Sequence, residues 1–443
     1  MMKQDIAWPP TNINKVAVFG MARSGKSALK LAMNTFPEVF AVNQGKVENW
    51  FPTLEVQGLS RERCFSQNEF LFEDMDLIIL SPGIALSVPE LNKARERSVP
   101  IISEIEFAWR FVQNIPVVAI TGTNGKTTTT TMIAEFLKKS GKKIFCGGNI
   151  GIPYSEMILS QETFDLAVIE VSSFQLETIQ FFHPKVALIL NIFPNHSERY
   201  TSVQDYAAAK YRLIDNLNHE DTLILGEDNA YLPSLPVTKA RKLLFRKGSL
   251  PPSFHERFSF KDCPLPGEHN QANFYAAYLA LESLGIKGLE ESFQNFINEF
   301  KGVPHRLEFV REWQALKIYN DAKSTNMLAT TTALRAFEES KDLYLVLGGK
   351  IRDPKDLILP DLLPFKNRVK KIYSIGEASE KIAKDLGKNF EVEEVKDLLG
   401  LKEELVRTNP EGVLIFSPGF PSFDQFKNFE DRGEKFKSVM RSL

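Results

Sequence analysis

The sequence contains few cysteines, little net charge and no long apolar run. Its 443 residues include three cysteines, Cys64, Cys146 and Cys263, whose spacing allows neither a C-x-x-C metal or redox pair nor a disulfide framework. No segment approaches the ~18 unbroken apolar residues of a membrane span, and Met1–Pro10 lacks an apolar signal core. We therefore expect a protein of the reducing cytoplasm without membrane insertion.

The balance of charge limits the class of ligand. The 54 basic and 56 acidic side chains leave a net charge of −2, which argues against a large electrostatic footprint for nucleic acid. A local basic pocket for phosphates remains compatible with this charge. We expect small-molecule substrates and a monomeric protein.

Apolar residues are abundant and arranged in short runs. They make up 43% of the chain, and at ~150 residues per domain a length of 443 suggests about three domains. Short apolar strands alternate with helical stretches, which is typical of a parallel α/β fold. The first candidate strands are residues 16–19, 39–42, 77–80 and 101–102. We predict an α/β protein with domains at 1–103, 104–302 and 303–443.

A nucleotide phosphate loop is predicted at Gly122–Thr128. The apolar run Val117–Ile120 predicts a buried strand, Gly122 and Gly125 allow a sharp turn, and an amphipathic helix begins near Lys126. Backbone amides of such a loop converge on an anion. Lys126 can neutralise a β- or γ-phosphate and the Thr127 hydroxyl can hold Mg²⁺. We therefore predict ATP binding here.

A second glycine turn matches the strict pattern G-x-x-x-x-G-K-[ST] letter for letter. It runs from Gly20 to Ser27 after the strand 16–19, whereas Ile120 stands where the pattern requires a glycine in the first loop. Short patterns of this kind produce false positives, so one of the two matches is expected to mislead. The turn at Gly20–Ser27 could still hold a diphosphate on backbone amides.

Several polar residues follow predicted strands in the first two domains. Ser81–Gly83 follows the strand 77–80, Glu170 ends an apolar strand, and His196 follows the strand 186–190. The carboxyl edge of a parallel sheet is where ligands of open α/β folds bind. Glu170 is well placed to hold Mg²⁺, because a hard cation prefers oxygen ligands. A solvated acid and a structural histidine are the alternatives.

Three further positions allow two interpretations each. Asn149, in the expected tight loop Gly147–Pro153, can contact a ligand or bond to its own turn. Asn270 and Asn273, three apart on one predicted helix, can hold the adenine side of ATP or cap the helix. Lys210 lies on an alanine-rich helical stretch, and its charge alone favours a surface lysine.

The last domain repeats the α/β pattern. Its candidate strands are residues 316–319, 343–347, 372–375 and 413–416. Arg306, at the junction before the first of them, can clamp a phosphate through its guanidinium group.

Three stretches resemble the Mur ligase superfamily, the ATP-dependent amide ligases of peptidoglycan and folate metabolism. They are Thr121–Thr127 (Thr-Gly-Thr-Asn-Gly-Lys-Thr), Glu170–Glu177 (Glu-Val-Ser-Ser-Phe-Gln-Leu-Glu) and the tail Ser417–Phe429. The resemblance runs in order from Val16 to Gly433 and is strongest to the branch that adds D-glutamate to UDP-N-acetylmuramoyl-L-alanine.

The resemblance implies a Rossmann-like first domain for the UDP part of the substrate, a central ATP-binding domain, and a Rossmann-like last domain for D-glutamate. It also implies that ATP phosphorylates the substrate carboxylate and that the amine of D-glutamate attacks the acyl phosphate. Such a reaction belongs to peptidoglycan precursor synthesis.

Residue roles follow from the same resemblance. The UDP-substrate contacts are expected at Arg23, Ser24, Asn43, Gln44, Ser81, Pro82, Gly83, Asn149 and Ser172. The ATP contacts are expected at Gly122, Thr123, Asn124, Gly125, Lys126, Thr127, Thr128, Asn270, Asn273, Arg306, Asp321 and Lys323. The D-glutamate contacts are expected at Thr325, Ser422, Phe423, Phe429 and either Arg352 or Lys350.

The resemblance also implies two Mg²⁺ ions and a set of catalytic residues. The metal ligands are expected at Thr127, Glu170, His196 and Lys210, the last as a carbamate formed with CO₂. The catalytic residues are expected to be Lys126, Asn149, His196 and Lys210. The sequence departs from the family at Asn43, where an acid is frequent, and at Asn195 and Glu198, where aspartates are usual.

Two other functions compete with this interpretation. Another ligase of the superfamily, such as a folylpolyglutamate synthetase, is disfavoured by the first glycine turn and by the tail motif. A regulatory protein that binds ATP or a dinucleotide at Gly20–Ser27 would leave Glu170, His196 and Lys210 without a role.

Overall fold

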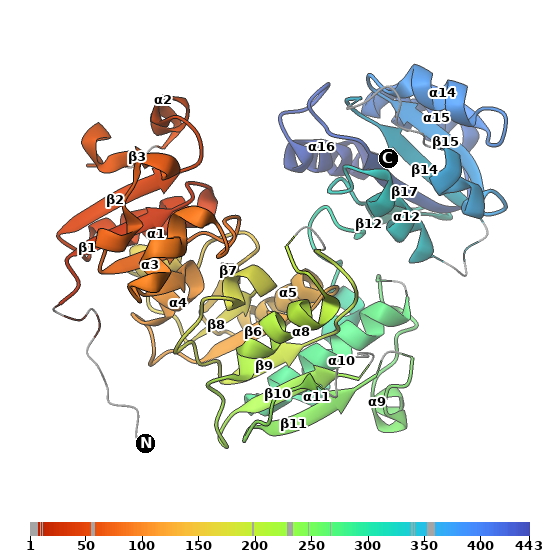
Figure 1. Ribbon diagram of the computed structural model, residues 1–443. Coiled ribbons are helices and arrows are strands. Elements are labelled where there is room, and N and C mark those ends of the chain that lie inside the picture. Colours follow the sequence, from red (N-terminus) through yellow and green to blue (C-terminus); the bar gives the residue numbers. More distant parts are fainter. Residues whose placement is uncertain are drawn as a thin grey trace. The chain divides into compact units, whose positions relative to one another are not determined.

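The computed structural model describes most of the chain. The described residues are 8, 10, 12–54, 58–196, 199–227, 234–246, 248–265, 267–337, 340, 342–351 and 359–443, without the side chains of residues 53, 328 and 359. They form two compact units, one comprising Met1–His255 with Ala272–Phe293 and the other Glu256–Gln271 with Gln294–Leu443. Figure 1 colours the chain along the sequence.

The first sheet of the first unit has five parallel strands in the order β3-β2-β1-β4-β5. The strands are β1 Lys15–Phe19, β2 Glu38–Asn43, β3 Cys64–Ser66, β4 Leu77–Leu80 and β5 Ile101–Ser103. The helices are α1 Arg23–Met33, α2 Val47–Trp50, α3 Asn92–Glu96 and α4 Glu104–Trp109. The chain passes from β1 to β2 and β3 on one side and then crosses over to β4 and β5 on the other, so the strand order reverses between β1 and β4. Ligands of doubly wound sheets bind beyond the carboxyl ends of the strands at such a switch point.

The second sheet has six parallel strands in the order β11-β10-β9-β6-β8-β7. The strands are β6 Val117–Thr121, β7 Ile144–Gly148, β8 Leu166–Glu170, β9 Val186–Ile189, β10 Thr222–Gly226 and β11 Arg241–Phe245. The helices are α5 Lys126–Lys139, α6 Ser155–Leu159, α7 Ser173–Leu176, α8 Val203–Tyr211, α9 Pro252–Arg257, α10 Glu268–Ser283 and α11 Leu289–Glu299. The segments after β6, β8 and β9 therefore meet at one edge of the sheet.

The third sheet, in the second unit, has the order β12-β13-β17-β14-β15-β16, with β12 antiparallel to β13 and the other pairs parallel. The strands are β12 Glu308–Trp313, β13 Leu316–Asn320, β14 Leu343–Gly348, β15 Val369–Ile375, β16 Val392–Lys396 and β17 Gly412–Gly419. The helices are α12 Met327–Arg335, α13 Leu359–Leu362, α14 Ser379–Leu386, α15 Leu398–Thr408 and α16 Phe429–Arg441.

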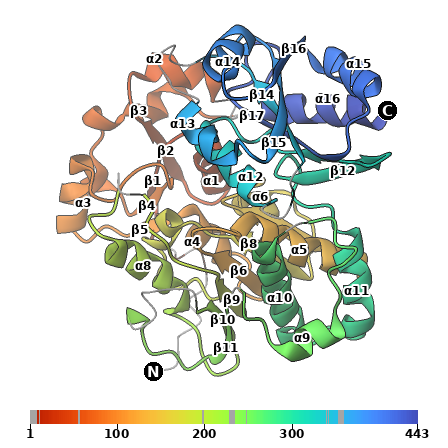
Figure 2. The same cartoon turned by 90° about the vertical axis from the view of Figure 1, so that its right-hand side faces the viewer.

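The central strands are buried at every position because helices cover both faces of parallel sheets. All five residues of β6 and of β8 are buried, as are all four of β4. Figure 2 shows α10 and α11 side by side, and the ring of Tyr278 on α10 packs 5.3 Å from that of Phe293 on α11. The predicted α/β class is confirmed. None of the helices in the described ranges is long and apolar enough to cross a membrane.

One predicted loop is wrong in part. Gly147 and Gly148 were expected in the tight loop Gly147–Pro153, but both belong to β7. Gly148 has φ of +97°, and a Cβ there would lie 2.4 Å from the carbonyl oxygen of Glu170. The loop therefore begins at Asn149, beside the end of β8.

Candidate functional site

The phosphate loop has the geometry that the sequence predicted. Gly122 and Gly125 have φ of +152° and +83°, and α5 begins at the next residue, Lys126, with Gly125 as its N-cap. A Cβ at Gly125 would lie 2.5 Å from Oδ1 of Asn273, so only glycine fits without a shift. The amide of Asn124 donates to Oδ1 of Asn191 at 2.8 Å, which ties the loop to the segment after β9.

The second glycine turn folds differently although it matches the stricter pattern. Helix α1 begins at Arg23, so Gly25 and Lys26 lie inside its first turn. A Cβ at Gly25 would lie 1.7 Å from the carbonyl oxygen of Gly20. Glycine here allows close packing of the helix on the turn, as in dinucleotide-binding folds, whereas Gly125 directly precedes its helix.

Lys126 and Thr127, the first two residues of α5, bond to different partners. Nζ of Lys126 donates to the carbonyl oxygens of Gly122 and Thr123, each at 2.9 Å. Oγ1 of Thr127 donates to Oε2 of Glu170 at 2.8 Å. The hydroxyl and the carboxylate thus present adjacent oxygens beside the start of α5, which is the ligand type that Mg²⁺ prefers.

Glu170 and Asn149 form a second contact at the same edge. Glu170 is 2% exposed, and its Oε1 accepts a hydrogen bond from Nδ2 of Asn149 at 2.9 Å. The amide of Asn149 also donates to the carbonyl oxygen of Glu170 at 2.8 Å. The side chain of Asn149 therefore faces the carboxylate beside the phosphate loop. Ser172 caps α7 two residues beyond Glu170 and accepts from the amide of Gln175.

Lys210 is buried, and the expectation of a surface lysine is wrong. Its side chain lies under the phosphate loop, 1% exposed, and Nζ donates to the carbonyl oxygen of Gly122 at 3.0 Å. Burial, with a further contribution from the charge of Lys126, lowers the pKa of Lys210 well below its ordinary value. No ion pair between Lys210 and a carboxylate occurs among the described residues. Packing of α8 beneath the loop, which composition does not reveal, buries this amine.

Tyr206 connects Lys210 with His196. The Tyr206 ring lies 4.5 Å from Nζ of Lys210 and 5.8 Å from the His196 ring. Its hydroxyl lies 3.3 Å from Oγ1 of Thr123 in the phosphate loop. His196 has φ of +58° and also packs 4.8 Å from the ring of Phe174. Tyr206 was not among the predicted site residues, although its spacing of four from Lys210 places both on one helix face.

Seven of the nine predicted UDP-substrate residues lie at or shortly after the ends of β1, β2 and β4 in the first sheet, whereas Asn149 and Ser172 follow β7 and β8. Oγ of Ser81 donates to the carbonyl oxygen of Gly20 at 2.7 Å, which joins the turns after β4 and β1. Oδ1 of Asn43, at the end of β2, accepts from the amide of Met21 at 3.2 Å. Nη1 of Arg23 donates to the carbonyl oxygen of Gly151 at 2.8 Å and so reaches the loop after β7. Ser24 is the second residue of α1, whereas Gln44 follows β2, and Pro82 and Gly83 follow β4.

Asn273 is not a helix cap. It is the sixth residue of α10, 9% exposed, and its Oδ1 lies 3.4 Å from Oγ1 of Thr129 in the first turns of α5. Thr128 on the same helix is half-buried. Asn270 precedes Asn273 by one helical turn and is 7% exposed.

In the second unit, the loops after β13 and β17 carry the predicted residues. Asp321 is buried, and its Oδ2 accepts from Oγ of Ser324 at 2.5 Å and Oγ of Ser417 at 2.7 Å. Burial raises the pKa of Asp321 to about 6, although these hydrogen bonds by themselves would lower it. Arg306 is exposed, and Nζ of Lys323 lies 6.0 Å from the Phe429 ring.

The tail residues do not form one hydrophobic core. Ser422 is 2% exposed, Phe423 is 66% exposed and Phe429 is half-buried, while Thr325 lies in the loop before α12. Lys350 is exposed, and its backbone amide donates to the carbonyl oxygen of Pro421 at 2.8 Å. Arg352 lies outside the described residues, so the choice between Lys350 and Arg352 stays open.

Arg432 organises these loops, and the sequence analysis missed it. Its guanidinium is fully buried and donates to the carbonyl oxygens of Ala322 and Phe420, each at 2.9 Å, and of Gly348 at 3.4 Å. Ala322 and Phe420 lie in the loops after β13 and β17, and Gly348 is the last residue of β14. Burial lowers the pKa of Arg432 to about 10. In the sequence Arg432 stands among charged residues of an amphipathic helix, which gives no sign of burial.

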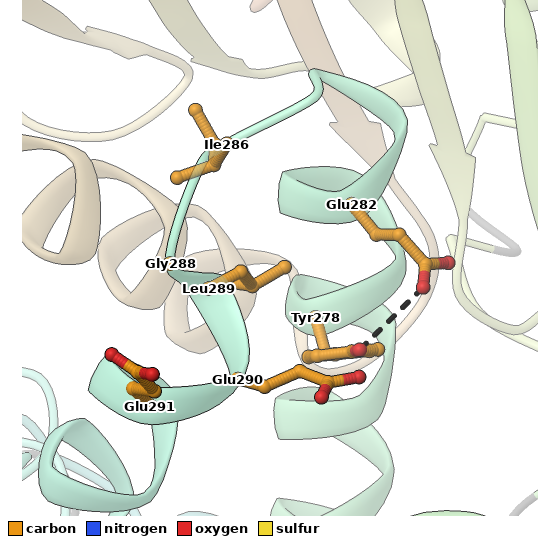
Figure 3. Close-up of a pocket in the computed structure, with 7 residues that line it drawn as sticks. All are labelled: Tyr278, Glu282, Ile286, Gly288, Leu289, Glu290 and Glu291. Carbon is orange, nitrogen blue, oxygen red and sulfur yellow. Dashed lines mark hydrogen bonds between the residues drawn. The ribbon is translucent and has the colours of Figure 1, made fainter.

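A cavity of about 370 Å³ in the first unit lies apart from these side chains. Figure 3 shows its lining by Tyr278 and Glu282 of α10 and by Leu289, Glu290 and Glu291 of α11. The hydroxyl of Tyr278 donates to Oε1 of Glu282 at 3.5 Å. None of the predicted site residues lines this cavity.

Comparisons with known proteins agree with this geometry. Residues 120–281 match the Mur ligase middle domain. A UDP-N-acetylmuramoylalanine–D-glutamate ligase of Koribacter versatilis is 34% identical over 97% of both chains. One of Aquifex aeolicus is 37% identical over 96% of this chain and 98% of the relative.

The chain belongs to the Mur ligase family.

A solved Mur ligase structure supports the fold independently. The UDP-N-acetylmuramate-alanine ligase of Thermotoga maritima superposes with a TM-score of 0.53 over 97% of this chain and 99% of the other, at 19% identity. The resemblance to the Mur ligases that the sequence motifs indicated is therefore confirmed.

Proposed function

We propose that this chain is an ATP-dependent ligase that joins D-glutamate to UDP-N-acetylmuramoyl-L-alanine in cytoplasmic peptidoglycan precursor synthesis. The observation that carries the proposal is the Glu170 carboxylate, which contacts Thr127 of the phosphate loop on one side and Asn149 on the other. One buried carboxylate thus contacts both the phosphate loop and the loop at Asn149, which is predicted to contact the substrate. The D-glutamate ligases of Koribacter versatilis and Aquifex aeolicus align along nearly the whole chain.

The phosphate loop fits the triphosphate of ATP. The free amides at the start of α5, with the positive end of its dipole, favour an anion beside Gly125. Lys126 now donates to two loop carbonyls, and its flexible side chain can turn to a β- or γ-phosphate oxygen. Preorganised donors of this kind stabilise the charge of a transferring phosphoryl group.

The residues beside the loop also fit Mg²⁺. Thr127 and Glu170 would hold one ion, and His196 with carbamylated Lys210 would contribute to a second. Bound Mg²⁺ would neutralise phosphate charge. Among the described residues no three His, Cys, Asp or Glu side chains gather for a metal. Further oxygen ligands would therefore come from a hydroxyl, the phosphates and a carbamate.

Lys210 suits carbamate formation because its amine is buried and lies beside a carbonyl rather than a carboxylate. The uncharged amine attacks CO₂, a new N–C bond forms, and one proton leaves. The product is a carboxylate-like group where the lysine ammonium would otherwise stand. It would lie between the Gly122 carbonyl and the Tyr206 ring, below the phosphate loop.

The remaining residues bind and orient the two other substrates. The turns at Gly20 and Ser81 would hold the diphosphate, and Asn149 would orient the carboxylate that becomes phosphorylated. In the second unit Arg432 fixes three loops, and Thr325, Ser422, Phe423 and Phe429 would contact D-glutamate. The amine of D-glutamate then attacks the acyl phosphate, an amide forms, and phosphate leaves. Enclosure protects the acyl phosphate from water. We expect the enzyme to act as a monomer.

Phosphate release tests the proposal. The protein is incubated with ATP, Mg²⁺ and UDP-N-acetylmuramoyl-L-alanine, and D-glutamate is compared with L-glutamate and L-lysine. We expect release only with D-glutamate, and none from the Lys126→Ala variant. Equal release with another amino acid would identify a different ligase of the family. Release at the same rate without the muramoyl substrate would contradict ligase activity altogether.

A further inference from the structure

Arg199 donates hydrogen bonds to two parts of the first unit. Its Nε and Nη2 donate to the two carboxylate oxygens of Glu177 at 3.0 and 2.5 Å, and its Nη1 donates to the carbonyl oxygen of Pro82 at 3.0 Å. The guanidinium also lies 4.4 Å from the ring of Phe174, and the side chain is 11% exposed. Arginine can form a planar fork with a carboxylate and still donate a third bond, which lysine cannot.

On one side, Arg199 is connected to the first sheet. Pro82 lies in the turn that follows β4, and the preceding residue, Ser81, donates from Oγ to the carbonyl oxygen of Gly20 at 2.7 Å. The amide of Ile84 closes the same turn on the carbonyl oxygen of Ser81 at 3.0 Å. The bond from Arg199 to Pro82 therefore reaches both turns at the switch point of the sheet.

On the other side, Arg199 is connected to the loop that carries His196. The amides of Arg199 and Tyr200 donate to the carbonyl oxygen of His196 at 3.0 and 3.1 Å, and the hydroxyl of Tyr200 donates to Glu177 at 2.7 Å. The Phe174 ring packs against His196 as well as against the Arg199 guanidinium. The left-handed backbone of His196 is thus fixed by groups that Arg199 holds in place.

We propose that Arg199 is a positioning residue that couples nucleotide binding at the Ser81–Gly83 turn to the geometry of His196 and the phosphate loop. The connected contacts run from the turn through Arg199 to His196, and from there through Tyr206 to Thr123. In this role Arg199 acts through Pro82, Glu177 and Phe174 rather than by contact with a ligand. The inference rests on the proposed function, because it takes the two ligands to be a uridine diphosphate group and ATP.

Coupling of this kind is reciprocal and can be measured without catalysis. Titration calorimetry gives the affinity for uridine diphosphate with and without a saturating non-hydrolysable ATP analogue and Mg²⁺, and the reverse titration is made as well. In the unmodified protein we expect each ligand to tighten the other at least about fivefold. In Arg199→Ala the factor should fall to about 1 while each ligand alone binds within about twofold of normal.

Two further variants separate positioning from general destabilisation. Arg199→Lys keeps the charge but can bond only one of the two partners at a time, so it should retain part of the coupling. Thr201→Ala, two residues along the chain, is the matched control, because it removes an exposed bond to Asp205 and leaves the bonds of Arg199 and Tyr200 to Glu177 and Pro82 intact. Its coupling factor should stay normal. If Arg199→Ala does not fold, judged by circular dichroism, Arg199→Lys alone decides the matter.

The outcomes distinguish this inference from the proposed function. Equal coupling in the unmodified protein and in the Arg199 variants, or no coupling in the unmodified protein, would overturn the role of Arg199. D-Glutamate-dependent phosphate release would remain unaffected by that result. Coupling that depends on Arg199 in a protein without D-glutamate-dependent release would instead overturn the proposed function alone.

Discussion

Replacing Glu104 by glutamine should change how the stability of this protein depends on pH. Glu104 is the first residue of α4, 1% exposed, and its Oε1 accepts from the amide of Ser155 at 2.6 Å and from the Ser155 hydroxyl. Its other oxygen, Oε2, has no hydrogen-bond partner among the described residues. The buried carboxyl thus joins the helix after the first sheet to the start of α6.

The magnitude follows from the pKa of this group. Burial raises the pKa of Glu104 from 4.5 to about 7, against the hydrogen bonds from Ser155. The folded protein therefore holds a proton that the unfolded chain has already lost, and stability falls as the pH rises from 4.5 to about 7. At 1.36 kcal/mol per pKa unit the full loss is about 3 kcal/mol. Glutamine keeps the acceptor oxygen and does not titrate.

Urea unfolding followed by tryptophan fluorescence measures the effect, and Trp109 on the same helix is a buried reporter. Between pH 5 and pH 8, Glu104→Gln should gain up to about 3 kcal/mol of unfolding free energy relative to the unmodified protein. Because the comparison uses only the change of this difference with pH, any pH-independent cost of burying the amide drops out. Glu96→Gln, which removes an exposed carboxylate of α3, should show no such change. A difference that stays constant over this range would refute the reasoning.

Three further predictions concern the two candidate sites. Gly125→Ala should weaken ATP binding roughly tenfold in calorimetry, since a left-handed alanine costs about 1–2 kcal/mol and its Cβ would meet Asn273. The control is Gly141→Ala, which has a similar φ but open space around it and should leave ATP binding unchanged. Lys210→Arg cannot form a carbamate, so its turnover should fall at least about 100-fold. Bicarbonate should restore the activity of the degassed unmodified enzyme but not that of the variant. Normal turnover of the variant would exclude the carbamate. Arg432→Met releases three loops and should raise the KM for D-glutamate about tenfold with the KM for ATP unchanged, and equal effects on both would indicate general unfolding.

The sequence located the central strands better than the edge strands. Residues 77–80 form β4 as predicted, and the end of β8 delivers Glu170 to the phosphate loop. These strands are buried on both faces, so their apolar runs are continuous. Edge strands such as β11 and β16 expose much of their length and mix charged with apolar residues, so their pattern is weak. They were not predicted.

Sequence patterns also failed to predict features that depend on tertiary packing. The strict phosphate-loop pattern fitted Gly20–Ser27 in letters, but helix α1 begins before Gly25, which packs on the turn. Charge and helical composition favoured a surface position for Lys210 and gave no sign that Arg432 is buried, because they say nothing about what packs against a helix.

By itself the sequence determined the α/β class, the phosphate loop and the family, because strand hydrophobicity, glycine turns and short motifs are local properties of the chain. Only the tertiary structure decided that Lys210 is a buried amine, that Tyr206 lies between it and His196, and that Arg199 bonds both Pro82 and Glu177. The burial of Lys210 and the partners of Arg199 depend on segments distant in the chain, since Lys210 bonds Gly122 with a separation of 88 residues and Arg199 bonds Pro82 with a separation of 117. They meet through the order in which parallel strands assemble, and no local pattern encodes that order.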